Sequence, residues 1–183
     1  MKYALMAFAN KGILRASHTD IAELAKVSVA TVFNYFNTKK ILLDAVLSEV
    51  ERFFLSLALE IYQDKTEGLK SLLNHAYSFV ETANTNEDYI KIWLEWGTSI
   101  KKETWSRYLA FQGQLIAMAA EAVSRAQVKG QIPDNVPALD IAYFFIGCAQ
   151  PIVIKLYTPG QDVKKVNEFI DRIIIQLLEY RKV

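Results

Sequence analysis

Four side chains on one face of a short predicted helix have the sizes and hydrogen-bonding groups that suit contact with DNA bases. Residues 29–36 carry apolar side chains at spacings of three and four, which predicts a helix with one buried side. That apolar set consists of Val29, Val32, Phe33 and Phe36. The opposite face presents small, hydroxyl, amide and phenol groups, namely Ala30, Thr31, Asn34 and Tyr35. A face without lysine or glutamate is unusual for a solvated helix, but it suits a helix that enters the major groove.

Another predicted helix precedes this one, and the pair has the organisation of a helix-turn-helix. Ser17 is the expected N-cap of the first helix, and Asp20 completes a capping box three residues later. Ser28 is the expected N-cap of the second helix. Both caps mark helix N-termini whose free N–H groups can receive phosphates. Thr38 is the expected cap of a third helix, and Lys39 directly after it is placed to reach a backbone phosphate.

Charge is distributed unevenly along the chain. Residues 1–46 hold six cationic and three anionic side chains, whereas residues 47–183 hold 15 cationic and 17 anionic ones. A basic segment followed by a slightly acidic one is typical of a DNA-reading domain joined to an effector domain. We therefore predict a helix-turn-helix DNA-binding domain over residues 1–46 and a helical ligand-binding and dimerisation domain over residues 47–183.

Composition and motifs predict an all-α protein that is not an enzyme. The 183 residues include seven glycines and four prolines, and helical periodicity runs through nearly the whole chain. His18 and His75 lie far apart in sequence without companion ligands, and there is no Gly-rich phosphate loop, so neither a metal nor a cofactor is expected. The single cysteine, Cys148, excludes an intrachain disulfide and fits a reducing cytoplasm. An all-α enzyme, or a carrier of an apolar ligand, is the alternative of a different class, but the sequence holds no clustered acid, base or metal set.

Two C-terminal segments predict a dimer interface. Residues 138–157 form a predicted helix that is apolar nearly all round and must be covered on all sides. Its apolar run is interrupted at Gln150 and Pro151 and is shorter than the roughly 20 residues that a membrane span needs, so we expect no membrane partner. Residues 162–181 predict an amphipathic helix. Because 52% of the residues are hydrophobic, we expect both helices to pack on their symmetry mates in a homodimer, with a monomeric core pair as the alternative.

The two remaining expectations concern the start of the chain and its tryptophan-rich segment. Residues 2–10 look like the middle of a helix that ends at Gly12, which predicts further natural residues before Met1, including a basic arm. In residues 88–102, the spacing predicts a solvated polar stripe that includes Glu95, with Trp93 on the opposite, inward side.

Residues 8–43 resemble the DNA-binding domain of TetR-type transcriptional regulators. The shared elements are Phe-x-x-x-Gly, Asp-Ile-Ala, Val-Ser-x-x-Thr-x-Phe-x-Tyr-Phe and the lysine at position 39. The run VSVATVFNYF, together with IKIWLEW further along, is most similar to the quorum-sensing master regulators of vibrios.

The resemblance implies a homodimeric, cytoplasmic, all-helical regulator with three helices for DNA and about six for dimerisation and ligand. Such a protein reads a pseudo-palindromic operator, here as a quorum-sensing-type master regulator; the alternative is a ligand-released repressor of a neighbouring transport or catabolic gene. The predicted contacts to double-stranded DNA are Ser17, Ser28, Ala30, Thr31, Asn34, Tyr35 and Lys39. The family also implies a pocket for a small, mostly apolar ligand, with plain aromatic core as the alternative. Its predicted wall consists of Phe54, Trp93, Trp96, Phe111, Phe145 and Cys148.

Overall fold

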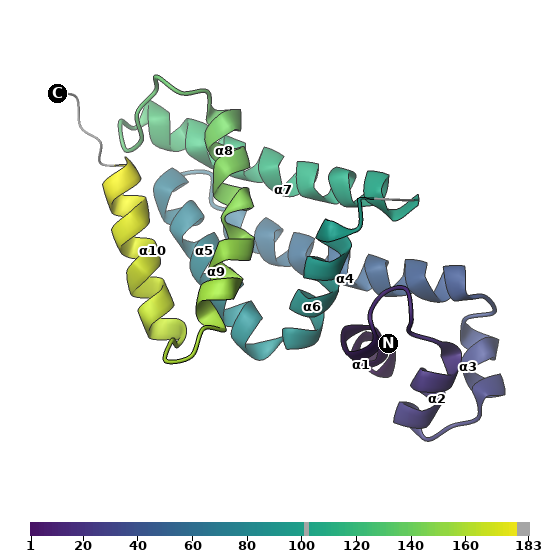
Figure 1. Cartoon of the computed structure of the whole chain (residues 1–183). Coiled ribbons are helices and arrows are strands. Elements are labelled where there is room, and N and C mark those ends of the chain that lie inside the picture. The colour runs from purple at the N-terminus through teal and green to yellow at the C-terminus, as the bar shows by residue number, and fades with distance from the viewer. Residues whose placement is uncertain (101–102, 179–183) are drawn as a thin grey trace. The chain divides into compact units, whose positions relative to one another are not determined.

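The computed structural model describes residues 1–100 and 103–178, which form ten α-helices and no strand. The all-α prediction is confirmed. The chain divides into two compact units, Met1–Phe54 with Asn86–Tyr108, and Leu55–Thr85 with Leu109–Val183. Two long helices, α4 (Lys39–Tyr62) and α7 (Glu103–Val128), each contribute residues to both units (Figure 1).

The first unit is built around the N-terminal helices. Its elements are α1 (Lys2–Lys11), α2 (His18–Ala25), α3 (Val29–Tyr35), α6 (Glu87–Thr98) and the N-terminal parts of α4 and α7. Helix α1 packs against α6 and α2, and α2 packs against α3. The side chains at the centre of this unit are fully buried, among them Phe8, Leu42, Val46, Ile90 and Trp96.

A carboxylate from α6 holds the turn between α1 and α2. Gly12 ends α1 in the left-handed region, with φ of 89°, as the sequence predicted for a helix stop. Both carboxylate oxygens of Glu95 accept the backbone N–H of Ile13 at 3.0 Å. A Cβ on Gly12 would lie 3.1 Å from each of those oxygens, so the approach is close. The predicted solvated stripe is therefore wrong at Glu95, which is half-buried and bound to backbone 82 residues away.

The N-terminal part of α7 is tied to α4 by one arginine. The guanidinium of Arg107 donates to Ser48 Oγ at 2.7 Å and pairs with Glu51 Oε2 at 2.5 Å. It also lies 5.9 Å from the ring centroid of Trp96, and Trp96 Nε1 donates to the carbonyl of Thr104 at 2.9 Å. These contacts fix the helix that directly follows α3.

The second unit surrounds α5 (Gly68–Thr85). Its other elements are the C-terminal parts of α4 and α7, α8 (Ala138–Gly147), α9 (Ala149–Leu156) and α10 (Val163–Leu178). Helix α5 packs against α9 and α10, which lie side by side with it in Figure 1. At its N-terminus α5 crosses α7 so closely that a Cβ on Gly68 would lie 2.5 Å from Ala126 N and 2.6 Å from Ala122 O.

The predicted single helix over residues 138–157 is wrong in one respect, because the helix is interrupted at Cys148. Cys148 ends α8 and precedes α9, and its N–H bonds to the carbonyls of Phe144 and Phe145. Pro151 has no N–H with which to continue the ladder to Gly147, and its ring disfavours a regular helix through that turn. With this interruption the described residues form seven helices after α3, which agrees with the expected number of about six. Of the other predicted interface helix, residues 179–181 lie outside the described residues.

Replacing Gly68 with alanine tests the close crossing of α5 and α7. Because the new methyl group would meet backbone atoms, we expect Gly68→Ala to lower the free energy of unfolding by about 1–3 kcal/mol. Gly113→Ala is the matched control, since a Cβ there meets nothing within 4 Å. It should raise that free energy by about 0.5–1 kcal/mol through helix propensity. Urea unfolding at equal protein concentration measures both, and equal stabilities of the two variants would contradict the crossing.

The bond from Glu95 to Ile13 can be tested in the same way. Glu95→Ala leaves the Ile13 N–H without its acceptor, so we expect the free energy of unfolding to fall by about 1–3 kcal/mol. The control is Glu87→Ala on the same helix, which removes only an exposed pair with Lys91 at 2.7 Å. Such a pair contributes about 0.3–0.5 kcal/mol. A loss for Glu95→Ala no greater than for the control would show that the turn does not depend on this carboxylate.

Candidate nucleic-acid interface

The N-terminus of α2 carries the predicted capping box. Ser17 Oγ accepts the N–H of Asp20 at 3.3 Å, and Asp20 Oδ2 accepts the N–H of Ser17 at 2.9 Å. Asp20 Oδ2 also accepts the Ser17 hydroxyl at 2.6 Å. This hydroxyl bond is the main cause that lowers the pKa of Asp20 below its usual value. Both side chains are thus engaged within the cap, which fixes where α2 begins.

The N-terminus of α3 is also capped as predicted. Ser28 Oγ accepts the N–H of Thr31 at 3.1 Å, and the two hydroxyl oxygens lie 2.8 Å apart. The turn before it depends on Lys26, which ends α2 in the left-handed conformation with φ of 56°. Lys26 N–H and Val27 N–H both bond back to the last turn of α2. The turn therefore closes α2 and starts α3 within three residues.

The outward face of α3 is confirmed, but the predicted inward face is only partly buried. Ala30 and Asn34 are exposed, and Tyr35 is 78% exposed. On the apolar side Val32 is buried, whereas Val29 and Phe33 are exposed by 36% and 45%. A helix of seven residues turns only about twice, so one row of side chains meets α2 and the flanking rows remain open.

A histidine that the sequence analysis had set aside orients α3. The ring of His18 stacks on Phe33 with centroids 4.0 Å apart and an angle of 1° between planes. Its Nε2 lies 2.6 Å from the carbonyl oxygen of Phe36, and the side chain is buried. His18 thus joins the start of α2 to the middle and end of α3. Sequence spacing gives no signal for this contact, because the partners lie 15 and 18 residues away.

Lys39, the predicted phosphate contact, begins α4 at the surface. Its Nζ donates to the carbonyl of Leu14 at 2.5 Å. The hydroxyl of Thr38 accepts the N–H of Ile41 at 3.1 Å, which confirms the predicted cap of this helix. The seven predicted DNA contacts therefore all lie on α2, α3, α4 or their caps, and their contact with DNA stays a prediction.

The six predicted ligand-wall residues are divided between the two units. Phe54, Trp93 and Trp96 lie in the first unit; Phe111, Phe145 and Cys148 lie in the second. The structure brings the rings of Phe54 and Trp93 together, with centroids 6.3 Å apart. Trp96 and Phe111 are fully buried, Phe145 and Cys148 are half-buried, and burial raises the pKa of the Cys148 thiol. Their role in binding a ligand stays a prediction.

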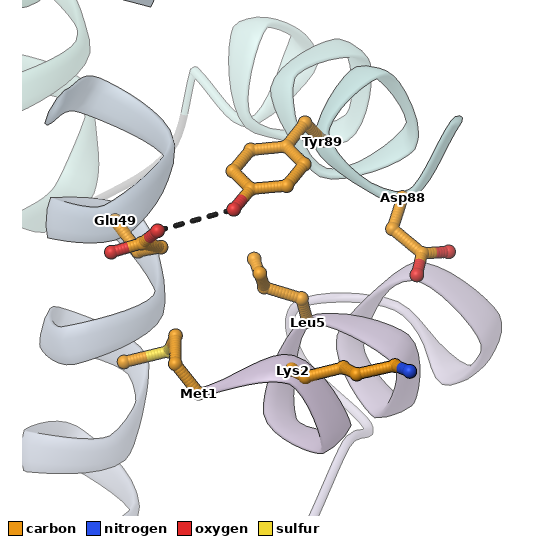
Figure 2. Close-up of a pocket in the computed structure, with 6 residues that line it drawn as sticks. All are labelled: Met1, Lys2, Leu5, Glu49, Asp88 and Tyr89. Carbon is orange, nitrogen blue, oxygen red and sulfur yellow. Dashed lines mark hydrogen bonds between the residues drawn. The ribbon is translucent and has the colours of Figure 1, made fainter. Parts of the chain in front are cut away.

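A small open hollow of about 220 Å³ lies between α1, α4 and α6 (Figure 2). Its lining residues are Met1, Lys2, Leu5, Glu49, Asp88 and Tyr89. The hydroxyl of Tyr89 donates to Glu49 Oε1 at 3.1 Å, and Arg52 bonds the same oxygen at 2.7 Å. None of the predicted ligand-wall residues lines this hollow. Across residues 1–100 and 103–178 no group of three or more potential metal ligands occurs.

Known proteins resemble this chain in its N-terminal segment and along most of its length. Residues 1–46 match the family model described as bacterial regulatory proteins of the tetR family. The HTH-type transcriptional regulator LuxR of Vibrio harveyi is 29% identical over 167 residues, which cover 91% of this chain and 82% of that protein.

Solved structures share the fold at low sequence identity. AibR, solved in complex with isovaleryl coenzyme A and operator DNA, has a TM-score of 0.79 and 19% identity, over 96% of this chain and 94% of that one. FadR from Bacillus subtilis, solved with stearoyl-CoA, has a TM-score of 0.77 and 15% identity, over 97% of both chains. The N-terminal segment therefore matches the tetR family model and has helix-turn-helix geometry, and the whole chain shares the fold of these solved structures.

Proposed function

We propose that the chain is a TetR-type transcriptional regulator, which acts in the cytoplasm as a homodimer and reads a pseudo-palindromic operator with α3 of each copy in a major groove. The exposed outer face of α3, with Asn34 and Tyr35 open to solvent, is the observation that carries this proposal. Two copies related by a two-fold axis would present their α3 helices to half-sites about one helical turn apart, or somewhat more. In this proposal residues 1–46 bind DNA and residues 47–183 bind ligand and the second copy.

Different side chains take different roles at the duplex. The amide of Asn34 can pair with a base edge, and Ala30, Thr31 and Tyr35 share its face of α3. Ser17, Ser28 and Lys39 contact phosphates, which position the protein without reading the sequence. Ser28 Oγ accepts the Thr31 N–H and lies 2.8 Å from Thr31 Oγ1, so when Thr31 is the donor of that pair the Ser28 hydroxyl can donate to a phosphate oxygen.

The second copy is proposed to cover an apolar stripe on α8 and α9. Four large side chains form this α8–α9 stripe, each more than half exposed in the single chain: Leu139, Tyr143, Phe144 and Ile154. By length and composition, Ala138–Leu156 would also suffice to cross a membrane, yet only 22% of it is buried within the chain. An apolar surface of this kind is typical of an obligate dimer interface. Helix α10 completes the interface in this proposal, although its Val166 and Ile170 are buried within the chain itself.

The type of regulation follows one of two schemes. The similarity to the vibrio regulator favours a quorum-sensing-type master regulator that both represses and activates genes. A ligand-released repressor is the second candidate, since AibR and FadR share the fold and were solved with acyl-CoA ligands. In the second scheme a small, mostly apolar ligand that binds the C-terminal domain lowers the affinity for the operator, whereas in the first scheme the operator affinity does not depend on a ligand. Measuring operator affinity with and without candidate metabolites distinguishes the schemes.

Substitutions on α3 and α4 test the two kinds of DNA contact. The operator for this test is a sequence selected from random DNA by the wild-type protein. Asn34→Ala should weaken binding to this operator by about 1–3 kcal/mol and relax base preference, because it removes a base-edge partner. Lys39→Ala should weaken binding to all duplexes about equally and lower the salt dependence by about one phosphate contact. Fluorescence anisotropy on operator and random DNA over a range of salt concentrations measures both effects.

Glu23→Ala serves as the control for these two variants, since Glu23 is exposed on α2 and lies outside the predicted contacts. The assignment of roles is wrong when both variants lose operator and random-DNA binding in the same proportion.

Placing a charge in the α8–α9 stripe tests the dimer. Phe144→Arg should raise the dimer dissociation constant about 30-fold or more, because an unpaired guanidinium would be buried at the interface. Analytical ultracentrifugation without detergent gives the constant. Val128→Arg is the control, because Val128 is 87% exposed at the end of α7 and lies outside the stripe. A wild-type chain that is monomeric at micromolar concentration, or that requires detergent to stay dispersed, would overturn this interface.

A further inference from the structure

An arginine in the second unit is buried without the partners that such a group needs. Arg125 lies on α7 with 20% of its side chain exposed. Its Nε and Nη2 atoms are buried and have no hydrogen-bond partner anywhere in residues 1–100 and 103–178. Unpaired buried guanidinium N–H groups are costly and rare, so they require an explanation.

The nearest acid compensates this charge poorly. Arg125 Nη1 lies 3.8 Å from Glu121 Oε2, which is too long for a hydrogen bond. That same oxygen accepts Lys65 Nζ at 2.9 Å, and the Glu121 side chain is 63% exposed. Arg107 on the same helix shows the contrast, since it bonds Ser48 and pairs with Glu51. The positive charge of Arg125 is therefore largely uncompensated by the described residues.

A neutral hydrogen-bonded pair, Tyr62 with His75, lies within electrostatic reach of this charge through Tyr62. The hydroxyl of Tyr62 and Nδ1 of His75 are 2.7 Å apart, and Tyr62 is 3% exposed. Burial raises the pKa of Tyr62, and the charge of Arg125 acts on it in the opposite direction. Burial lowers the pKa of His75 to about 4, so the imidazole is neutral near pH 7. Arg125 is thus the cation of a cluster whose other polar members are uncharged.

An aromatic side chain from α8 covers the histidine. The ring of Phe145 meets His75 edge-on with centroids 5.8 Å apart. Phe145 belongs to the predicted ligand wall, and α8 carries Tyr143 and Phe144 of the proposed dimer stripe. The cluster of Tyr62, His75, Arg125 and Phe145 therefore combines one charge, two hydrogen-bonding groups and an apolar cover.

We propose that Arg125, with Tyr62 and His75 beside it, binds the carboxylate of a small monoanionic ligand whose apolar body packs against Phe145. This inference rests on the proposed function, in that the C-terminal domain binds a small ligand, and it names the chemical class. The edge of a guanidinium formed by Nε and Nη2 matches a carboxylate with two parallel hydrogen bonds. A phosphate dianion would bring a second charge that neither Tyr62 nor His75 neutralises. Since Nε and Nη2 are sealed from solvent, ligand entry requires that neighbouring side chains move aside.

The test uses saturated fatty acids from butyrate to dodecanoate and the matching neutral amides, titrated into the full-length protein by calorimetry. At least one acid should bind, and its amide should bind about tenfold to a hundredfold more weakly, as expected for losing a charge-assisted pair. Arg125→Met should reduce the affinity for the acid to that of the amide. Lys129→Met is the control: directly after α7 it removes a cation that pairs with Glu67 and donates to the carbonyl of Thr66, and it should leave the affinity for the acid unchanged.

Thermal unfolding of the ligand-free variants gives a second, independent measurement. Arg125→Met should raise the melting temperature, because it removes an uncompensated buried charge while keeping most of the volume. A lower melting temperature for Arg125→Met than for Lys129→Met would show that Arg125 is a structural residue and would overturn the inference. Equal binding of acids and amides, or no binding of any acid, would overturn it as well. Operator binding is measured on the same samples. A wild-type protein that does not bind operator DNA would contradict the proposed function itself, whatever the result with the fatty acids.

Discussion

The carboxylate of Glu95 accepts the backbone N–H of Ile13, and this bond ties helix α6 to the turn that precedes α2 and α3. It works only because Gly12 has no side chain at the point of contact. The capping box then sets the start of α2. His18, the first residue of α2, stacks on Phe33 and bonds the carbonyl of Phe36, so the start of α2 orients α3. A helix of seven residues is marginal by itself, so the direction of α3 depends on this chain of contacts.

Local features of the fold were predictable from sequence because they act between residues three or four positions apart. The pair of Ser17 and Asp20 has the spacing of a capping box, and the structure contains both bonds. Ser28 and Thr38 cap their helices as expected, and Gly12 ends α1. The outward face of α3 followed from periodicity as well, since it required only that one row of side chains meet α2.

Contacts between distant segments were not predictable, because polar residues in a periodic pattern are normally assigned to solvent. Glu95 fitted a solvated stripe, and only the folded chain shows that its partner is 82 residues away. His18 had no companion ligands in sequence, which argued against a metal but did not reveal its stacking on Phe33. Arg125 carries no signal of its own in the sequence, and its burial depends on elements that α7 meets only in the folded unit. Periodicity gives the face of a helix but not the neighbour that covers it.

The interruption at Cys148 divides residues 138–156 into two short helices that need not share one axis. A continuous rod of nineteen residues would have to tilt as a whole, so a shift at one end would shear the contacts at the other. With the ladder interrupted at Cys148, α9 packs on α5 and α10, and α8 can take its own direction from the joint. A change in the direction of α8 would then alter the backbone at Cys148, and the packing of α9 on α5 and α10 would be kept.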